Sequence, residues 1–466
     1  MLEDREPTRG GTSEVQEPTA ENAVPGKVSK LAIWSYVLYN FGNTPFSATI
    51  MVLYFPLWLT EQYGAGPALI NNATAIAALL VLLIAPGLGA LADLHQRRLP
   101  YLVFFTLVVV FLTAGLDFTD ELTGSVLVAV AFFVVAFVAY QLTQLLYFAL
   151  LPGVSAGRGT GTVSGYSQAG GLIGTFIAVV GLTLFIAPDS FLGFKVGGPD
   201  EIRSVLGPVG GWVKTSSAAV DSNTFLPTAA FYLLFALPAF FFVPDVAVHA
   251  PQRARLGEAY RSVFATLRGL RAYAGVGTYM LVTLLFMAAV NVAIPNVCLF
   301  AKDVFKMADQ QIANLMIFSL VFSALAAFGA GRVSDRLGPK RTLLATLVLW
   351  AVAIMAVTLA WAPWVLYVAQ PLLFLAMGAT FTLGPVLLIA LSPSAKITEF
   401  MGFYVMVGMV ATIVGPLIVS LLLEVFGGLG TGAAYRIAMS SFAVAMVLGI
   451  FLLLRIPDAR TPDAST

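Results

Sequence analysis

The sequence predicts an all-α polytopic membrane protein in which twelve transmembrane helices form two similar six-helix halves. Hydrophobic residues make up 59% of the 466 residues and charged residues 11%, against about 45–50% and about 25% in soluble domains. A basic turn also occurs twice, as GALADLHQRR at 89–98 and as GRVSDRLGPKR at 331–341. Each copy lies between apolar runs long enough to span a bilayer. The turn recurs at an offset of 242 positions, which indicates an internal repeat.

Hydropathy predicts twelve spans, and their continuous apolar runs favour helices over the alternating strands of a membrane barrel. The spans cover residues 31–60, 68–92, 99–116, 124–151, 162–187, 224–243, 273–301, 309–333, 340–360, 363–391, 397–424 and 434–455. They give an N-terminal bundle at 31–243 and a C-terminal bundle at 273–455, joined by a cytoplasmic linker at 244–272. Residues 1–30 are polar and acidic and predict a disordered cytoplasmic tail, and 456–466 form a second tail.

The distribution of cations predicts the orientation. With residues 1–30 inside, 19 of the 25 Lys and Arg fall on the inner side. Three of the other six lie in one long outer loop, 188–223, where the positive-inside rule is weak. Both termini are therefore expected to be cytoplasmic, in a plasma (inner) membrane. The outer loop itself is either a cap over the outer mouth or a plain variable loop.

The linker contains an amphipathic pattern. Apolar residues recur at helical spacing, with Arg261 and Arg268 among the polar positions, at Leu256, Ala259, Tyr260, Val263, Phe264, Leu267 and Leu270. The pattern predicts a helix on the inner leaflet, where each cation is worth about 1 kcal/mol near anionic lipid. The same residues also serve as a linker between the halves. A nucleic-acid partner is disfavoured, and we expect a monomer in contact with membrane lipids and a small-molecule solute.

Several kinds of chemistry lack the residues they need. No predicted span carries Asp, Glu, Lys, Arg or His near its middle. Because such residues mark proton relays and charged-substrate sites, this disfavours a carboxylate pump and a strongly charged substrate. The single cysteine, Cys298, excludes an internal disulfide and a multi-Cys metal site. His95 and His249 fall in polar turns, so the residues for a histidine metal cluster or a His-based triad are missing. We therefore expect no metal, no cofactor, no catalytic residue and no enzyme activity.

The spans carry neutral polar residues beside prolines instead. Pro45 in the first span and Pro295 in the seventh are 250 positions apart, and asparagines flank both. Helices interrupted at matching places in two halves are the best sequence sign of a transporter's binding site. We therefore predict a central substrate cavity lined by Tyr39, Asn40, Asn43, Gln141, Gln144, Tyr147, Gln168, Asn291 and Asn296. The alternative for any single residue is an amide that only joins neighbouring helices.

The repeated turns predict a gate. Gly89 and Gly331 permit close approach of helices, and cations after a helix end interact with its free carbonyls. Asp93 and Asp335 stand at unfavourable dipole positions and should need a partner from a neighbouring helix or turn. A charge lock of this kind can form in one conformation and break in another; the alternative is plain anchoring of the topology. The predicted gate residues are Gly89, Asp93, Arg97, Arg98, Gly331, Asp335, Arg336, Gly338, Lys340 and Arg341.

These turns resemble the signature of the major facilitator superfamily, G-x-x-x-D-R-x-G-x-K/R between spans 2 and 3 and between spans 8 and 9. The second copy matches it fully, whereas the first has Leu94 and Gln96 where Arg and Gly are usual. Within the superfamily, three stretches resemble the vacuolar amino-acid effluxer-like group, typified by the autophagy-related effluxer of fungi: residues 38–59, 150–174, and TEFMGFY at 398–404 followed by Gly-Pro at 415–416. The chain departs from that group at Asn40, usually Asp, at Ser167-Gln168, and at 383–385, where an arginine is usual.

The resemblance implies a secondary active or facilitative transporter that works by alternating access. A small neutral or zwitterionic solute is expected, with amino-acid efflux implied by the resemblance alone. The residues that replace the usual acid and arginine weaken the case for proton coupling and for carboxylate recognition. A non-transporting receptor or signalling protein would need a soluble effector domain or a large ectodomain. An intramembrane enzyme would need catalytic groups at membrane depth, which the predicted spans lack.

Overall fold

The computed structural model describes residues 28–119, 123–186, 224–246, 256–268, 273 and 275–457. Within those ranges every regular element is a helix, which confirms the predicted all-α class. Four of the sequence predictions fall wholly or largely outside the described residues. They concern the N-terminal tail (1–27), the outer loop (188–223), parts of the linker (247–255 and 269–272) and the C-terminal tail (458–466).

The first bundle is formed by the helices that precede the linker. They are α1 (Lys30–Phe46), the π-helical segment η2 (Ser47–Tyr54), α2 (Phe55–Tyr63), α3 (Pro67–His95), α4 (Leu99–Leu116), α6 (Val126–Ser155), α7 (Thr160–Ile186) and α9 (Phe225–Phe242). The linker contributes α10 (Leu256–Arg268).

The second bundle repeats this pattern after the linker. Its helices are α11 (Val276–Asp303), α12 (Asp309–Leu337), α13 (Pro339–Thr358), α14 (Pro363–Leu391), α15 (Ile397–Phe426) and α16 (Thr431–Leu454), with short 3₁₀ turns at Ser394–Lys396 and Gly427–Leu429. Ten helices among the described residues are long and apolar enough to cross a membrane. The two other predicted spans coincide with the continuous stretch α1–η2–α2 and with α7. The chain is therefore a multi-pass membrane protein.

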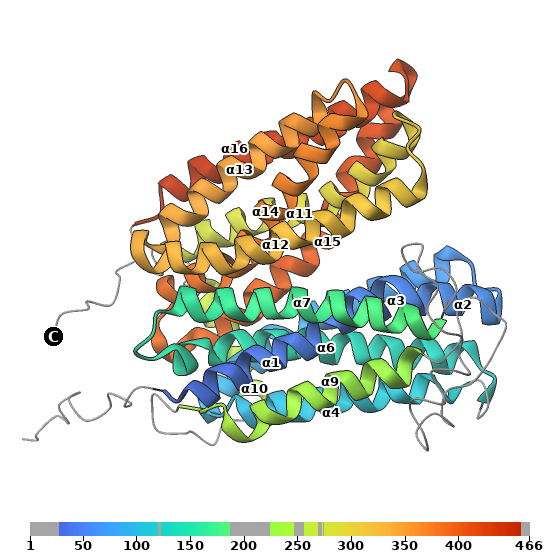
Figure 1. The fold of residues 1–466 in the computed structure, drawn as a ribbon. Helices are drawn as coiled ribbons and strands as arrows, with labels where there is room; N and C mark the ends of the chain where they lie inside the picture. Colours follow the sequence, from blue (N-terminus) through green and yellow to red (C-terminus); the bar gives the residue numbers. More distant parts are fainter. Residues whose placement is uncertain are drawn as a thin grey trace, which may run out of the picture.

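The two bundles lie side by side and meet through a few helices. Helix α3 packs against α15, and α7 packs against α12 and α14. The bundles come closest at the end that holds residues 89–98 and 331–341, and their other ends diverge (Figure 1). We call the end that holds these two basic turns the basic end. The contact between the halves is therefore concentrated where the repeated turns lie.

The two prolines expected to interrupt helices behave differently. Helix α1 gives way to the π-helical segment η2 two residues after Pro45, and the Thr49 hydroxyl donates to the Pro45 carbonyl at 2.8 Å. The predicted interruption of the first span is confirmed. In contrast, α11 runs unbroken past Pro295, so the prediction of a matching interruption in the seventh span is wrong. The Asn296 amide donates to the carbonyl of Val292 at 2.9 Å, one turn back, and so supports the helix where proline removes a neighbouring backbone donor.

Both basic turns end a helix with a residue of positive φ. Gly338 ends α12 at φ 89°, a conformation that glycine adopts without strain. The matching residue at the end of α3 is Gln96, at φ 52°. Its side-chain amide donates to the carbonyl of Asp93, which stabilises this less favourable backbone. Pro339 then opens α13, a position where its missing N–H costs nothing.

Candidate functional site

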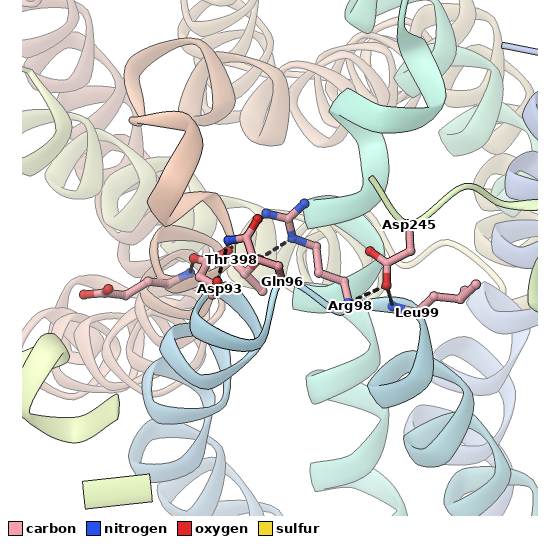
Figure 2. A network of polar contacts seen from close by, with 7 residues as sticks. Asp93, Gln96, Arg98, Leu99, Asp245 and Thr398 are labelled. Atoms are coloured by element: carbon pink, nitrogen blue, oxygen red, sulfur yellow. Dashed lines mark hydrogen bonds and ion pairs between the residues drawn. The ribbon is translucent and has the colours of Figure 1, made fainter. Parts of the chain in front are cut away.

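Asp93, in the last turn of α3, contacts the first turn of α15 in the opposite bundle (Figure 2). Its Oδ2 accepts from the backbone N–H of Glu399 at 2.8 Å, and its Oδ1 lies 3.1 Å from Nη2 of Arg98. The Asp93 and Arg98 side chains are 5% and 7% exposed. N–H groups in the first turn of a helix lack intrahelical partners and lie at the positive end of its dipole. Asp93 therefore has the neighbouring-helix partner that its position required.

Arg98 extends this network in two directions (Figure 2). Its Nε donates to the Thr398 hydroxyl at 2.8 Å, so the guanidinium binds both Asp93 and the start of α15. Its backbone N–H and that of Leu99 donate to Oδ2 of Asp245 at 2.8 and 2.9 Å. Asp245 lies just after α9, and through these two hydrogen bonds it caps the N-terminus of α4. The turn is thus fixed within its own bundle and against the other one.

Asp335 makes the equivalent contact from the second bundle. It lies in the last turn of α12, and its Oδ1 and Oδ2 accept from the backbone N–H groups of Gly161 and Thr162 at 2.8 and 2.7 Å. Both donors belong to the first turn of α7, in the first bundle. Each half therefore supplies one aspartate to a helix N-terminus in the other. We call these two contacts, Asp93 with α15 and Asp335 with α7, the basic-end lock.

Glycines four residues before each aspartate allow this approach. A Cβ on Gly89 would lie 2.4 Å from the carbonyl oxygen of Thr398, and one on Gly331 would lie 2.2 Å from that of Gly161. Both neighbours are backbone atoms, so no side-chain rotation can relieve the clash. The prediction that these two glycines permit close helix approach is confirmed.

The remaining predicted gate residues are placed differently. Lys340 donates from Nζ to the carbonyl of Ile456 at the end of α16. The side chains of Arg97, Arg336 and Arg341 are exposed on the surface of the turns. Arg98 is the cation that pairs with an aspartate of the lock. A gating role stays a prediction for every residue of this set, including Asp93, Asp335 and Arg98.

Comparison with known proteins agrees with this architecture. Residues 279–466 match the model of the Major Facilitator Superfamily (MFS). The MFS-type transporter YxiO of Bacillus subtilis (strain 168) is 20% identical over 441 residues, which cover 92% of this chain and 96% of the relative. The proton:xylose symporter XylE, bound to 6-bromo-6-deoxy-D-glucose, superposes with a TM-score of 0.68 over 92% of this chain and 95% of that chain, at 13% identity.

The chain has the major facilitator fold. A second solved structure of this fold, FucP in the outward conformation, gives a TM-score of 0.66 at 14% identity, over 91% of this chain and 98% of that chain. At these identities the likeness defines the arrangement of helices and leaves the solute open.

Four of the predicted cavity residues lie together inside the first half of the major facilitator fold. Tyr39, Asn40, Asn43 and Tyr147 are at most 3% exposed. The Asn40 amide donates to the carbonyl of Ser167 at 2.9 Å, and Tyr147 shares a short hydrogen bond with the Ser167 hydroxyl. The Tyr39 hydroxyl is 2.7 Å from that of Thr106 and 3.1 Å from that of Tyr232. These contacts give Tyr39, Asn40 and Tyr147 a helix-joining role in this conformation, whereas the buried Asn43 Nδ2 has no hydrogen-bond partner among the described residues.

The amides of the first bundle outside this network are less buried. Gln141 and Gln144 lie one turn apart on α6, and Gln168 lies on α7; all three are half-buried. In the second bundle, Asn291 is exposed and its amide donates to the Thr412 hydroxyl at 3.2 Å, whereas Asn296 is buried. The predicted substrate residues therefore form a buried set of four and a half-buried set of three glutamines in the first half, and two separate positions on α11.

The sequence did not identify the partners of the lock. Thr398 and Glu399 fall in stretch 398–404, and Gly161 falls in the glycine-rich stretch 150–174. Both stretches resemble the effluxer-like group, but the resemblance predicts no contact with an aspartate of the lock. Asp245 follows Pro244 at the end of α9 and carried no recognisable signal. Arg332, in the second basic turn, makes a further contact between the halves, because its Nη2 donates to the Tyr166 hydroxyl at 2.8 Å.

Proposed function

We propose that the protein is a secondary active or facilitative transporter that moves a small neutral or zwitterionic solute by alternating access. The basic-end lock carries this proposal, because two repeat-related aspartates each hold a helix from the opposite half. Such contacts consist of a few hydrogen bonds between two separately packed bundles. They can break and form again without unfolding either bundle. A non-transporting receptor has no particular observation in its favour.

The orientation of the lock follows from charge. The predicted topology assigns 19 of the 25 Lys and Arg to the side of the two basic turns, which favours a cytoplasmic location for that end and for both termini, in the plasma (inner) membrane. On this orientation, the locked conformation is closed to the cytoplasm. The divergence of the bundles at their other ends and the similarity to FucP in the outward conformation both favour an outward-facing state.

The solute class rests on the neutral character of the helices. Half-buried Gln141, Gln144 and Gln168 offer donors and acceptors without charge, which suits hydroxyl or amide groups. Amino-acid efflux is the specific form that the resemblance favours. The test is solute flux into proteoliposomes for a panel of neutral sugars, neutral amino acids and organic anions. Uptake of one neutral or zwitterionic class supports the proposal, and uptake confined to organic anions contradicts the proposed solute class.

We expect Asp335→Asn to reduce transport more than it reduces abundance. An asparagine presents one carbonyl oxygen and one NH₂ to two backbone donors, so one of the two hydrogen bonds is lost and the charge is removed. Because Asp335 is exposed, the locked conformation should lose about 1 kcal/mol of stabilisation, which corresponds to roughly a fivefold fall in flux. Flux per molecule in proteoliposomes is compared with the amount of protein in the same vesicles. Unchanged flux per molecule removes the gating role of Asp335.

The predicted cavity residues can be tested by cysteine labelling in a Cys298→Ser background. We expect Asn291→Cys to react with a membrane-impermeant maleimide in the conformation described here, because that side chain is exposed. Asn40→Cys and Asn43→Cys are expected to react only when the bundles rearrange during transport. If Asn40 and Asn43 remain sealed from water on both sides while solute is moving, they are helix-joining residues and not part of the cavity.

A further inference from the structure

Linker helix α10 lies against α3 beside the lock. The Tyr260 hydroxyl donates to the carbonyl of Leu83 at 3.1 Å. Its ring covers Gly87, where a Cβ would lie 2.6 Å from Cζ of Tyr260. Gly87 is two residues before Gly89, so this contact adjoins the segment of α3 that α15 approaches from the other half. Helix α10 is therefore attached to the first bundle at the position of the lock.

The same helix is also attached to the second bundle. The Ser262 hydroxyl donates to Oε2 of Glu399 at 3.1 Å, and Nζ of Lys396 donates to the Thr266 hydroxyl at 2.7 Å. Lys396 immediately precedes α15, and Glu399 is the residue whose backbone N–H binds Asp93. Helix α10 thus bridges α3 and α15 across the contact that the lock closes.

The surface of α10 is divided into three faces. Ala259, Val263 and Thr266 are buried against the bundles, at 0%, 5% and 1% exposure. An adjacent apolar face is exposed, with Tyr260 at 36%, Phe264 at 59% and Leu267 at 43%. Beyond the apolar face, at positions i and i+7, lie the exposed side chains of Arg261 and Arg268. Buried, apolar and basic faces follow one another around the helix.

The apolar face matches a lipid surface. Leu83, whose carbonyl binds Tyr260, is 63% exposed and continues an exposed apolar stripe along the span α3 that includes Ile76, Leu79 and Leu80. Acyl chains that cover the stripe on α3 therefore extend to the apolar face of α10. The arginines border that face, and a basic border beside an apolar face is the arrangement that binds anionic headgroups. Charge and apolar surface together identify the partner as an anionic lipid leaflet.

We propose that anionic lipids at the basic end bind α10 through Arg261 and Arg268 and thereby favour the locked conformation. This inference depends on the proposed transporter function, since it requires that the lock open. Lipid contact fixes α10 at the membrane surface, where Ser262 and Thr266 meet Glu399 and Lys396. These two hydrogen bonds exist only while α15 lies beside α3. Ordering α10 in advance lowers the entropy cost of forming them.

The test measures the opening of the basic end in nanodiscs. Spin labels at Arg158→Cys and Leu337→Cys, two exposed positions in opposite halves, report the separation of the halves by pulsed double resonance in a Cys298→Ser background. We expect the ratio of short to long distances to rise from phosphatidylcholine to an equimolar mixture with phosphatidylglycerol. The rise should be at most about fivefold for each arginine, the limit in which lipid binds α10 only in the locked conformation. Arg261→Gln with Arg268→Gln should abolish it, whereas Arg455→Gln, an exposed cation outside α10, should retain it.

The outcomes separate the two proposals. Two distance populations with a ratio that does not depend on lipid overturn the role of α10 and leave alternating access intact. Retention of the lipid dependence in the double arginine variant also overturns it. A single distance under every condition, including during solute flux, contradicts alternating access and the inference that depends on it.

Discussion

Gly331→Ala is expected to prevent closure of the basic end and to reduce transport by at least about fivefold. The added Cβ would lie 2.2 Å from the carbonyl oxygen of Gly161 and 3.1 Å from Cα of Gly165, so α12 and α7 cannot keep their present separation. Overpacking of this kind costs about 1–3 kcal/mol, roughly 5- to 150-fold in the ratio of closed to open molecules. The strain falls between the halves, so each bundle keeps its own core. The measurement is flux per molecule together with the Arg158–Leu337 label distance.

Gly329→Ala provides the matched control. It makes the same substitution two residues earlier on the same helix, where a Cβ would meet nothing within 4 Å. We expect this variant to have the parent flux and the parent distance distribution. If Gly331→Ala also behaves like the parent, close approach of α12 and α7 is not needed for transport.

Asp93→Asn is expected to shift the molecule strongly toward a state open at the basic end. The substitution removes the charge that binds the Glu399 N–H and leaves the buried Arg98 guanidinium without its ion-pair partner. A hydrogen bond to a charged group contributes about 1.5–3 kcal/mol, so the closed-to-open ratio should fall roughly 10- to 150-fold. The effect should exceed that of Asp335→Asn, because Asp93 is buried and Asp335 is exposed. The label distance in nanodiscs measures the shift directly.

Glu424→Gln controls for the loss of an acidic side chain. Glu424 is exposed near the opposite end of α15, far along the helix from Glu399. The Glu424→Gln substitution should leave the label distance distribution unchanged. A distribution for Asp93→Asn that equals the parent's would mean that Asp93 stabilises the turn within its own half and does not hold α15.

Much of the fold follows from patterns within the chain. Apolar runs give the spans because a lipid-exposed backbone must satisfy its own hydrogen bonds. The repeat of Gly89 and Asp93 at Gly331 and Asp335 reveals two halves, since the spacing is a property of the sequence alone. Pro45 predicts a change in helix geometry because it removes a donor. Pro295 removes one as well, yet α11 stays helical past it, with the Asn296 amide bonded to the Val292 carbonyl, and hydropathy does not predict that contact.

The partners of the aspartates could not be predicted in the same way. Asp93 binds a backbone N–H that is 306 residues away, and backbone groups leave no mark in the sequence. The polar residues of the first span illustrate a second limit. A helix face with Tyr39 and Asn40 has the same pattern whether it lines water or joins helices, and the difference depends on packing against α7 and α9.

The central claim is that the two halves pivot about a centre, so that one end opens as the other closes. Two label pairs measured in the same variant test it, Arg158–Leu337 at the basic end and Glu61–Glu424 at the opposite end, all four positions being exposed. In Asp93→Asn, relative to the parent, we expect the first distance to lengthen and the second to shorten. If the first lengthens while the second stays constant or lengthens too, the halves separate without pivoting, and alternating access is contradicted.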